Sequence, residues 1–135
     1  QKAIEFGTST FHRIFTTDAL VRVSGGPKAL AGAGPDSWAK VVKNALKDYE
    51  STQHLIGTQI VAFTDVQFEN GEVASGEAEM SSYLQAWHAW PDRRVRIVLG
   101  TYHDKVRFSS GKGWQIYDMT LEYTSVEHRQ MGNAT

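Results

Sequence analysis

The stretch Glu69-Asn70-Gly71-Glu72 decides the fold, because Asn-Gly is the strongest short signal for a two-residue β-hairpin turn. Residues 51–63, before the turn, are rich in apolar and β-branched residues, which predicts a long strand. Residues 73–87, after it, place small and apolar side chains at the even positions from Ala74 to Leu84. The two segments therefore predict an antiparallel hairpin whose even positions on the second strand face inward.

Two more strands follow, at residues 95–108 and 114–124, with a glycine-containing turn at 109–113 between them. Residues 19–23 form a further short strand pattern near the N-terminus. Each long segment exceeds the usual length of a strand, so the sheet is predicted to curve. Gly76 and Gly100 interrupt otherwise regular strands and are the predicted bend points.

Helical patterns lie only in the first third of the chain. Residues 8–15 space their apolar side chains as a short helix does. A second helix is expected to begin near Pro35, with Asp36 or Ser37 as its cap, and its apolar stripe runs from Trp38 to Tyr49. Helices followed by an antiparallel meander predict an α+β domain, with the helices packed on one face of the sheet.

Composition narrows the classes of function. The 135 residues fit one domain, 1–135, and carry a formal net charge of -1, which gives no basic surface for nucleic acid or an anionic membrane. The absence of cysteine excludes disulfides and thiol chemistry. No apolar run reaches the roughly 20 residues that span a bilayer, and no signal-peptide pattern opens the chain. A cytoplasmic protein is the expectation.

The histidines do not predict a metal site. None of the five stands in a spacing typical of zinc ligands. His54 lies in the first long strand pattern, where both faces are fairly apolar, so periodicity does not say which way it points. A lone strand histidine is more often structural than catalytic, although an imidazole suits proton transfer at neutral pH. Aromatic residues from Tyr83 to Tyr102 allow two interpretations, ordinary packing or the wall of a ligand pocket.

Four short motifs occur in an order that resembles the SnoaL-like branch of the NTF2-like superfamily. They span nearly the whole chain: Phe15-Thr-Thr-Asp18-Ala-Leu-Val, Thr52-Gln53-His54-Leu55-Ile56-Gly57, Gly100-Thr-Tyr102-His-Asp104 and Gly113-Trp114-Gln-Ile116. The resemblance implies a cone, in which a curved, mainly antiparallel sheet and its helices enclose a central pocket. The family's long first helix has no match after Gln1, so we expect it to be missing or to precede that residue.

The resemblance also implies a chemistry. Scytalone dehydratase and hexachlorocyclohexane dehydrochlorinase use the histidine that His54 matches as a general base. Glu5 is the expected acidic partner, and Asp18 is the other acidic candidate near the start of the chain. The dehydratase's second pocket histidine has no clear counterpart, since His88 lies a few residues beyond the aligned position. The expected pocket walls are Phe15, Trp38, Val42, Met80, Tyr83, Tyr102 and Tyr117, with Tyr83 or Tyr102 as hydrogen-bond donor to an oxyanion.

These matches predict a lyase or isomerase of the dehydratase, dehydrohalogenase or cyclase type, of the kind found in polyketide or aromatic metabolism. It would act on a small apolar, ring-containing molecule without cofactor or metal, and would assemble as a homodimer or homotrimer. The alternative is a non-catalytic ligand-binding or oligomerisation module, because such modules share this fold.

Overall fold

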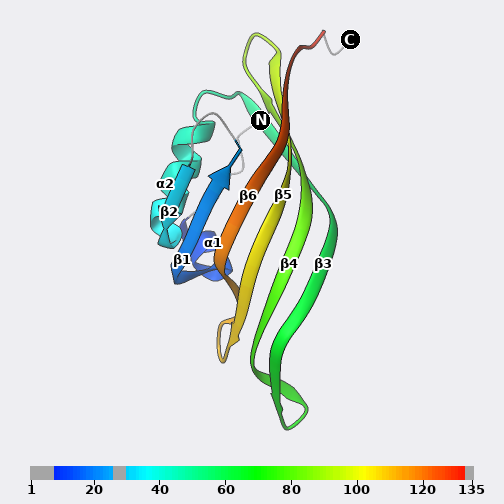
Figure 1. Ribbon diagram of the computed structural model, residues 1–135. Helices are drawn as coiled ribbons and strands as arrows, with labels where there is room; N and C mark the ends of the chain where they lie inside the picture. Colours follow the sequence, from blue (N-terminus) through cyan, green and yellow to red (C-terminus); the bar gives the residue numbers. More distant parts are fainter. Residues whose placement is uncertain (1–7, 26–29, 133–135) are drawn as a thin grey trace.

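The computed structural model describes residues 8–25 and 30–132, which form two helices and one six-stranded sheet (Figure 1). The elements in chain order are α1 Thr8–Ile14, β1 Phe15–Ser24, β2 Leu30–Ala33, α2 Gly34–Leu46, β3 Ser51–Glu69, β4 Glu72–Ala89, β5 Arg94–Ser109 and β6 Gly113–Gln130. No described helix is both long and apolar enough to cross a membrane.

The sheet runs in the order β2-β1-β6-β5-β4-β3. Only β1 and β6 pair in parallel, and every other neighbouring pair is antiparallel. Strands β3 to β6 are long and bend together, while α1 and α2 lie beside β1 and β2 at one side of the curve (Figure 1). This arrangement confirms the predicted α+β class and the curved, mainly antiparallel sheet.

The Asn-Gly turn closes the hairpin as predicted. Asn70 and Gly71 both adopt positive φ, 52° and 79°, which is the backbone of a two-residue type I′ turn. Glu69 pairs directly with Glu72, and the two strands stay paired as far as Ser51 with Ala89. The hairpin is therefore longer than the alternation pattern indicated.

The two predicted bend points have different roles. Gly100 lies at a register shift between β5 and β6, and a Cβ there would meet the Glu122 carbonyl oxygen at 2.7 Å, so the bend needs glycine. Gly76 lies at no register shift. Instead, a Cβ on Gly76 would meet the Trp114 ring at 2.8 Å, so this glycine leaves room for an aromatic side chain.

Helix α2 begins differently from the prediction. Pro35 does lie in its first turn, but the N-cap is Ala33 and no side chain caps the helix. Asp36 is not the cap; its carboxylate accepts a hydrogen bond from His12 Nε2 at 2.8 Å, which ties α2 to α1. The apolar stripe is confirmed where Trp38 is buried and Val41 and Val42 pack against the core.

The core lies between α2 and the inner face of the sheet, which we define as the face that carries the buried Leu84 and Ala86 of β4. Strand β3 is one of the two edge strands of the sheet, and most of its residues are exposed. The buried core residues are Phe15, Ala19, Val21, Val23, Trp38, Leu84, Ala86, Val98, Met119 and Leu121.

Candidate active site

The sheet register places His54 on the inner face. Residues paired directly across an antiparallel ladder point to the same side, and His54 of β3 pairs with the buried Ala86 of β4. His88, two residues further along β4, lies on the same face. The Nε2 atoms of His54 and His88 are 3.3 Å apart, and the two rings meet edge to face at a centroid distance of 5.2 Å.

The hydrogen-bond partners of His88 fix the protons of both rings. His88 Nδ1 lies 3.1 Å from the carbonyl oxygen of Arg96, which can only accept, so Nδ1 carries the proton. A neutral His88 then presents a lone pair at Nε2. His54 Nε2 must therefore donate to it, which leaves His54 Nδ1 as the unprotonated nitrogen. The pair has one free basic atom, on the more exposed ring.

Burial keeps this pair neutral. Loss of hydration lowers the pKa of His88 to about 4, and the charges of His54 and Arg96 act in the same direction. The His88 side chain is 5% exposed, whereas His54 lies on the exposed edge strand. Partial desolvation also lowers the pKa of His54. Neutral pH thus leaves His54 able to accept a proton and His88 fixed as its neutral partner.

A group of aromatic side chains packs on the His88 side of the pair. The Tyr49 ring, from the segment between α2 and β3, packs on His88 and on Trp90, with centroid distances of 4.9 Å in both cases. Trp90 in turn stacks with His128 at 6.2 Å and lies beneath the Arg94 guanidinium. At this end of the sheet, an aromatic ring thus packs on His88, whereas His54 is exposed.

The other expected site residues divide into three groups. Phe15 and Trp38 are buried in the core, and Val42 packs against it. Tyr102 faces inward, and burial raises its pKa to about 12. Met80 lines a hollow on the inner face.

Two of the expected pocket residues, Tyr83 and Tyr117, do not lie with His54. Tyr83 is 63% exposed and pairs with Gly57 and Thr101 on the outer face, since odd positions of β4 point away from the core. Tyr117 packs on the Arg107 guanidinium, 4.2 Å from its ring centre, roughly 30 Å along β6 from the residues level with His54. Glu5 lies outside the described residues.

The sequence interpretation missed His88. The signal was present, because folding the chain about Asn70-Gly71 brings His54 opposite residues 86–88, and His88 shares the even positions with Leu84. Three register shifts between β3 and β4 hide the exact register; they lie between Gly57 and Gln59, between Phe63 and Asp65, and between Gln67 and Phe68.

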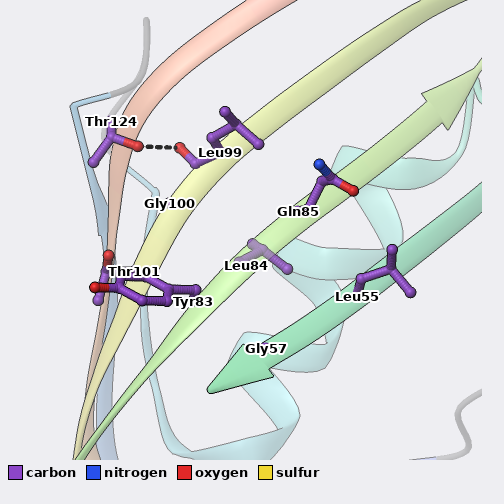
Figure 2. A pocket seen from close by; sticks show the side chains of 9 residues that line it. All are labelled: Leu55, Gly57, Tyr83, Leu84, Gln85, Leu99, Gly100, Thr101 and Thr124. Atoms are coloured by element: carbon purple, nitrogen blue, oxygen red, sulfur yellow. Dashed lines mark hydrogen bonds between the residues drawn. The ribbon is translucent and has the colours of Figure 1, made fainter. Parts of the chain in front are cut away.

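Each face of the sheet has a hollow. One lies on the outer face, measures about 410 Å³ and is bordered by Leu55, Tyr83 and Leu99, as Figure 2 shows. There the Thr124 hydroxyl donates to the Leu99 carbonyl oxygen at 3.0 Å. The other, also about 410 Å³, lies on the inner face and is mostly apolar. Its lining residues are Arg13, Ile14, Val61, Phe63, Ala78, Met80, Val106, Trp114 and Ile116. His54 borders neither hollow.

The described residues contain no group of three or more histidine, aspartate or glutamate side chains arranged to hold a metal ion. His54 and His88 alone supply two nitrogens, one of which already donates to the other. Proton transfer is the chemistry that these side chains can perform without further groups.

The profile of the SnoaL-like domain matches residues 7–120. The chain belongs to the SnoaL-like family. This membership agrees with the motifs around His54 and with the curved sheet. No protein of curated function matches the chain.

Several solved structures share this SnoaL-like fold. A proposed scytalone dehydratase from Novosphingobium aromaticivorans superposes with a TM-score of 0.67 at 20% identity, covering 93% of this chain and 76% of its own. The hexachlorocyclohexane dehydrochlorinase LinA-type3 from Novosphingobium barchaimii superposes with a TM-score of 0.67 at 9% identity. The match covers 95% of this chain and 80% of the dehydrochlorinase. The β subunit of a proposed aromatic-ring-hydroxylating dioxygenase from N. aromaticivorans superposes with a TM-score of 0.59 at 22% identity. The match covers 89% of this chain and 78% of the β subunit. These neighbours share the fold of this chain, and their names state different functions.

Proposed function

We propose that this SnoaL-like protein is a cofactor-independent lyase or isomerase in which His54 is the general base. The observation that carries the proposal is the hydrogen-bonded chain from His54 Nε2 to His88 Nε2 and from His88 Nδ1 to the Arg96 carbonyl. It leaves His54 Nδ1 free to take a proton. The family's dehydratase and dehydrochlorinase neighbours support this class of reaction.

In the proposed reaction, His54 Nδ1 removes a proton from a carbon next to an electron-withdrawing group. In an elimination, the electron pair of the broken C–H bond forms a double bond while the leaving group departs with its own bonding pair. In an isomerisation, the electron pair shifts the double bond and the His54 imidazolium returns the proton to a different carbon. The imidazolium that results keeps its Nε2 proton on His88, and this hydrogen bond strengthens because its donor is now charged. His88 positions the ring and stays neutral, so it is a positioning residue.

Tyr102 is the remaining proposed donor to an oxyanion. Its raised pKa keeps the hydroxyl protonated throughout the neutral range. Tyr102 pairs with Ser82, which is roughly 13 Å along β4 from the Ala86 that pairs with His54. This role therefore requires a substrate that spans several strand positions, such as a molecule with fused rings. Glu5, the acidic partner that the family resemblance implies, lies outside the described residues, and in this proposal His88 takes the positioning role of such a partner.

Proton abstraction can be tested before the substrate is known. Cyclic ketones incubated with the protein in deuterium oxide would exchange their acidic C–H protons, which ¹H NMR records. We expect His54→Gln to slow this exchange by about 10²–10⁴-fold. His103→Gln is the control, because His103 bonds Glu122 on the outer face and should leave the rate unchanged. A folded His54→Gln protein that exchanges at the wild-type rate would refute the assignment.

A second candidate is a ligand-binding module without turnover. The observation that favours it is the apolar hollow on the inner face, which His54 does not border. Saturable binding of ring compounds, with no proton exchange in any of them, would support this candidate over the enzyme.

A further inference from the structure

Arg96 of β5 carries a positive charge on the inner face, beside the histidine pair. It pairs directly with His88 of β4 and with His128 of β6, so its side chain points to the same side as His88. The residue is partly buried. Its backbone carbonyl accepts the hydrogen bond from His88 Nδ1, whereas its guanidinium takes no part in that chain. The proposed reaction therefore leaves this cation without a role.

The Arg96 guanidinium lies level with His54. Its Cζ atom is 5.7 Å from the centre of the Tyr123 ring, and Tyr123 pairs with Gly100, four residues further along β5. Because Arg96 and Gly100 are roughly 13 Å apart along the strand, the two side chains reach towards each other over Val98. Val98 lies level with His54, across β4. The cation and the proposed base thus share one face, on strands β5 and β3, which are roughly 10 Å apart.

No described acidic side chain forms an ion pair with Arg96. The acidic residues on the adjoining part of β6, Glu122 and Glu127, lie on the outer face, and each is ion-paired there. Asp48 and Glu50, in the segment between α2 and β3, are exposed. The guanidinium is thus a partly buried cation that contacts an aromatic ring and has no counterion among the described residues.

This charge opposes the proposed reaction unless an anion compensates it. His54 becomes positive when it takes a proton, and a second positive charge roughly 10 Å away in a partly desolvated site repels it. The charge of Arg96 already contributes to the lowered pKa of His88. An anionic group on the substrate would remove the repulsion. The planar guanidinium offers two parallel N–H donors, a geometry that fits a carboxylate.

We propose that Arg96 binds a carboxylate of the substrate, so that the molecule on which His54 acts is a ring-containing carboxylic acid in its ionised form. This inference rests on the proposed function and names its substrate class. The separation of roughly 10 Å between the two strands, less a contact distance at each end, places the carboxylate a few bonds from the carbon that loses the proton.

A matched pair of probes tests the charge without turnover. 4-Oxocyclohexanecarboxylate and 4-oxocyclohexanecarboxamide have nearly the same shape, but only the first is an anion. Calorimetric titration at pH 7.5 should show the carboxylate binding at least about tenfold more tightly, as expected for a bidentate bond between charged groups. Arg96→Gln should remove that difference and leave binding of the amide unchanged. Arg129→Gln is the control, because Arg129 is exposed and bonds Glu127 on the outer face, and it should change neither affinity.

Two further variants complete the test. His54→Gln should keep the preference for the carboxylate, so binding at Arg96 is measured separately from proton exchange. Arg96→Lys decides the matter if Arg96→Gln fails to fold, and it should weaken the preference, because an ammonium group does not offer two parallel donors. A wild type that prefers the carboxylate but exchanges the protons of neither probe would refute the role of His54 and still support the carboxylate site. Equal affinity of the wild type for both probes, no binding of either, or an unchanged preference in Arg96→Gln or Arg96→Lys would each overturn the inference.

Discussion

Replacing His88 by phenylalanine should destabilise the protein by about 2–4 kcal/mol at pH 7.5. The new ring can keep the contact with Tyr49, but it cannot donate to the Arg96 carbonyl, which His88 Nδ1 approaches at 3.1 Å. A part-buried carbonyl without its donor costs about 1–3 kcal/mol, and loss of the 3.3 Å bond from His54 adds about 0.5–1.5 kcal/mol.

The same substitution should change the pH dependence of stability. The pKa of His88 is about 4 in the fold against 6.5 in the unfolded chain, so the unfolded chain binds more protons between these values. The stabilising contribution of neutral His88 is therefore present above pH 6.5 and is lost as pH falls towards 4. The difference in free energy of unfolding between the wild type and His88→Phe should therefore shrink by up to about 3 kcal/mol as pH falls from 6.5 to 4.

Urea denaturation at a series of pH values between 4 and 7.5 measures both effects. His128→Phe is the matched control, because His128 is exposed and stacks only on Trp90, and it should change stability by less than about 0.5 kcal/mol. A His88→Phe protein as stable as the wild type at pH 7.5, or a difference that stays constant across the series, would refute the buried donor–acceptor chain.

Three further predictions concern the rest of the sheet. Gly100→Ala should lower stability by about 1–3 kcal/mol in thermal or urea unfolding, because its Cβ would lie 2.7 Å from the Glu122 carbonyl oxygen; an unchanged midpoint would contradict the bend. Burial raises the pKa of Asp104 to about 6 from 3.8, so its stabilising contribution is present below pH 3.8 and is lost as pH rises through 6. Urea unfolding of Asp104→Asn should thus show a free energy of unfolding higher than that of the wild type by up to about 3 kcal/mol at pH 7.5, and an equal one near pH 3.5. A lower free energy of unfolding at pH 7.5 would mean that the carboxylate has a stabilising partner. Tyr83→Glu, on the outer hollow beside Leu55, should convert the proposed dimer or trimer into monomers in light scattering, and an unchanged mass would place the interface elsewhere.

The sequence predicted the elements that depend on local signals. Asn70-Gly71 fixed the hairpin, and the apolar stripe from Trp38 fixed α2. The sequence did not predict the features that depend on how the strands pair. The parallel pairing of β1 with β6 joins segments about 100 residues apart in the chain, and no local pattern encodes it.

The candidate site was also predicted only in part. His54 was found from a motif, whereas His88 became visible only once the hairpin was folded through the bulges of β3. Tyr83 was assigned to the pocket through the family resemblance, although the alternation pattern predicted that the even positions of its strand, Leu84 among them, face inward. Asp104 ends one of the four family motifs, but its burial could not be predicted, because three strands that meet only in the fold enclose it.

The proton positions of the histidine pair test the account most directly. Long-range ¹H–¹⁵N NMR of the imidazole rings at pH 7.5, assigned with His54→Gln and His88→Phe, reports which nitrogen of each ring is protonated. The account predicts that His54 carries its proton on Nε2 and His88 on Nδ1, with His54 Nδ1 unprotonated. A proton on His54 Nδ1 would contradict it, because the nitrogen assigned as the base would not be free.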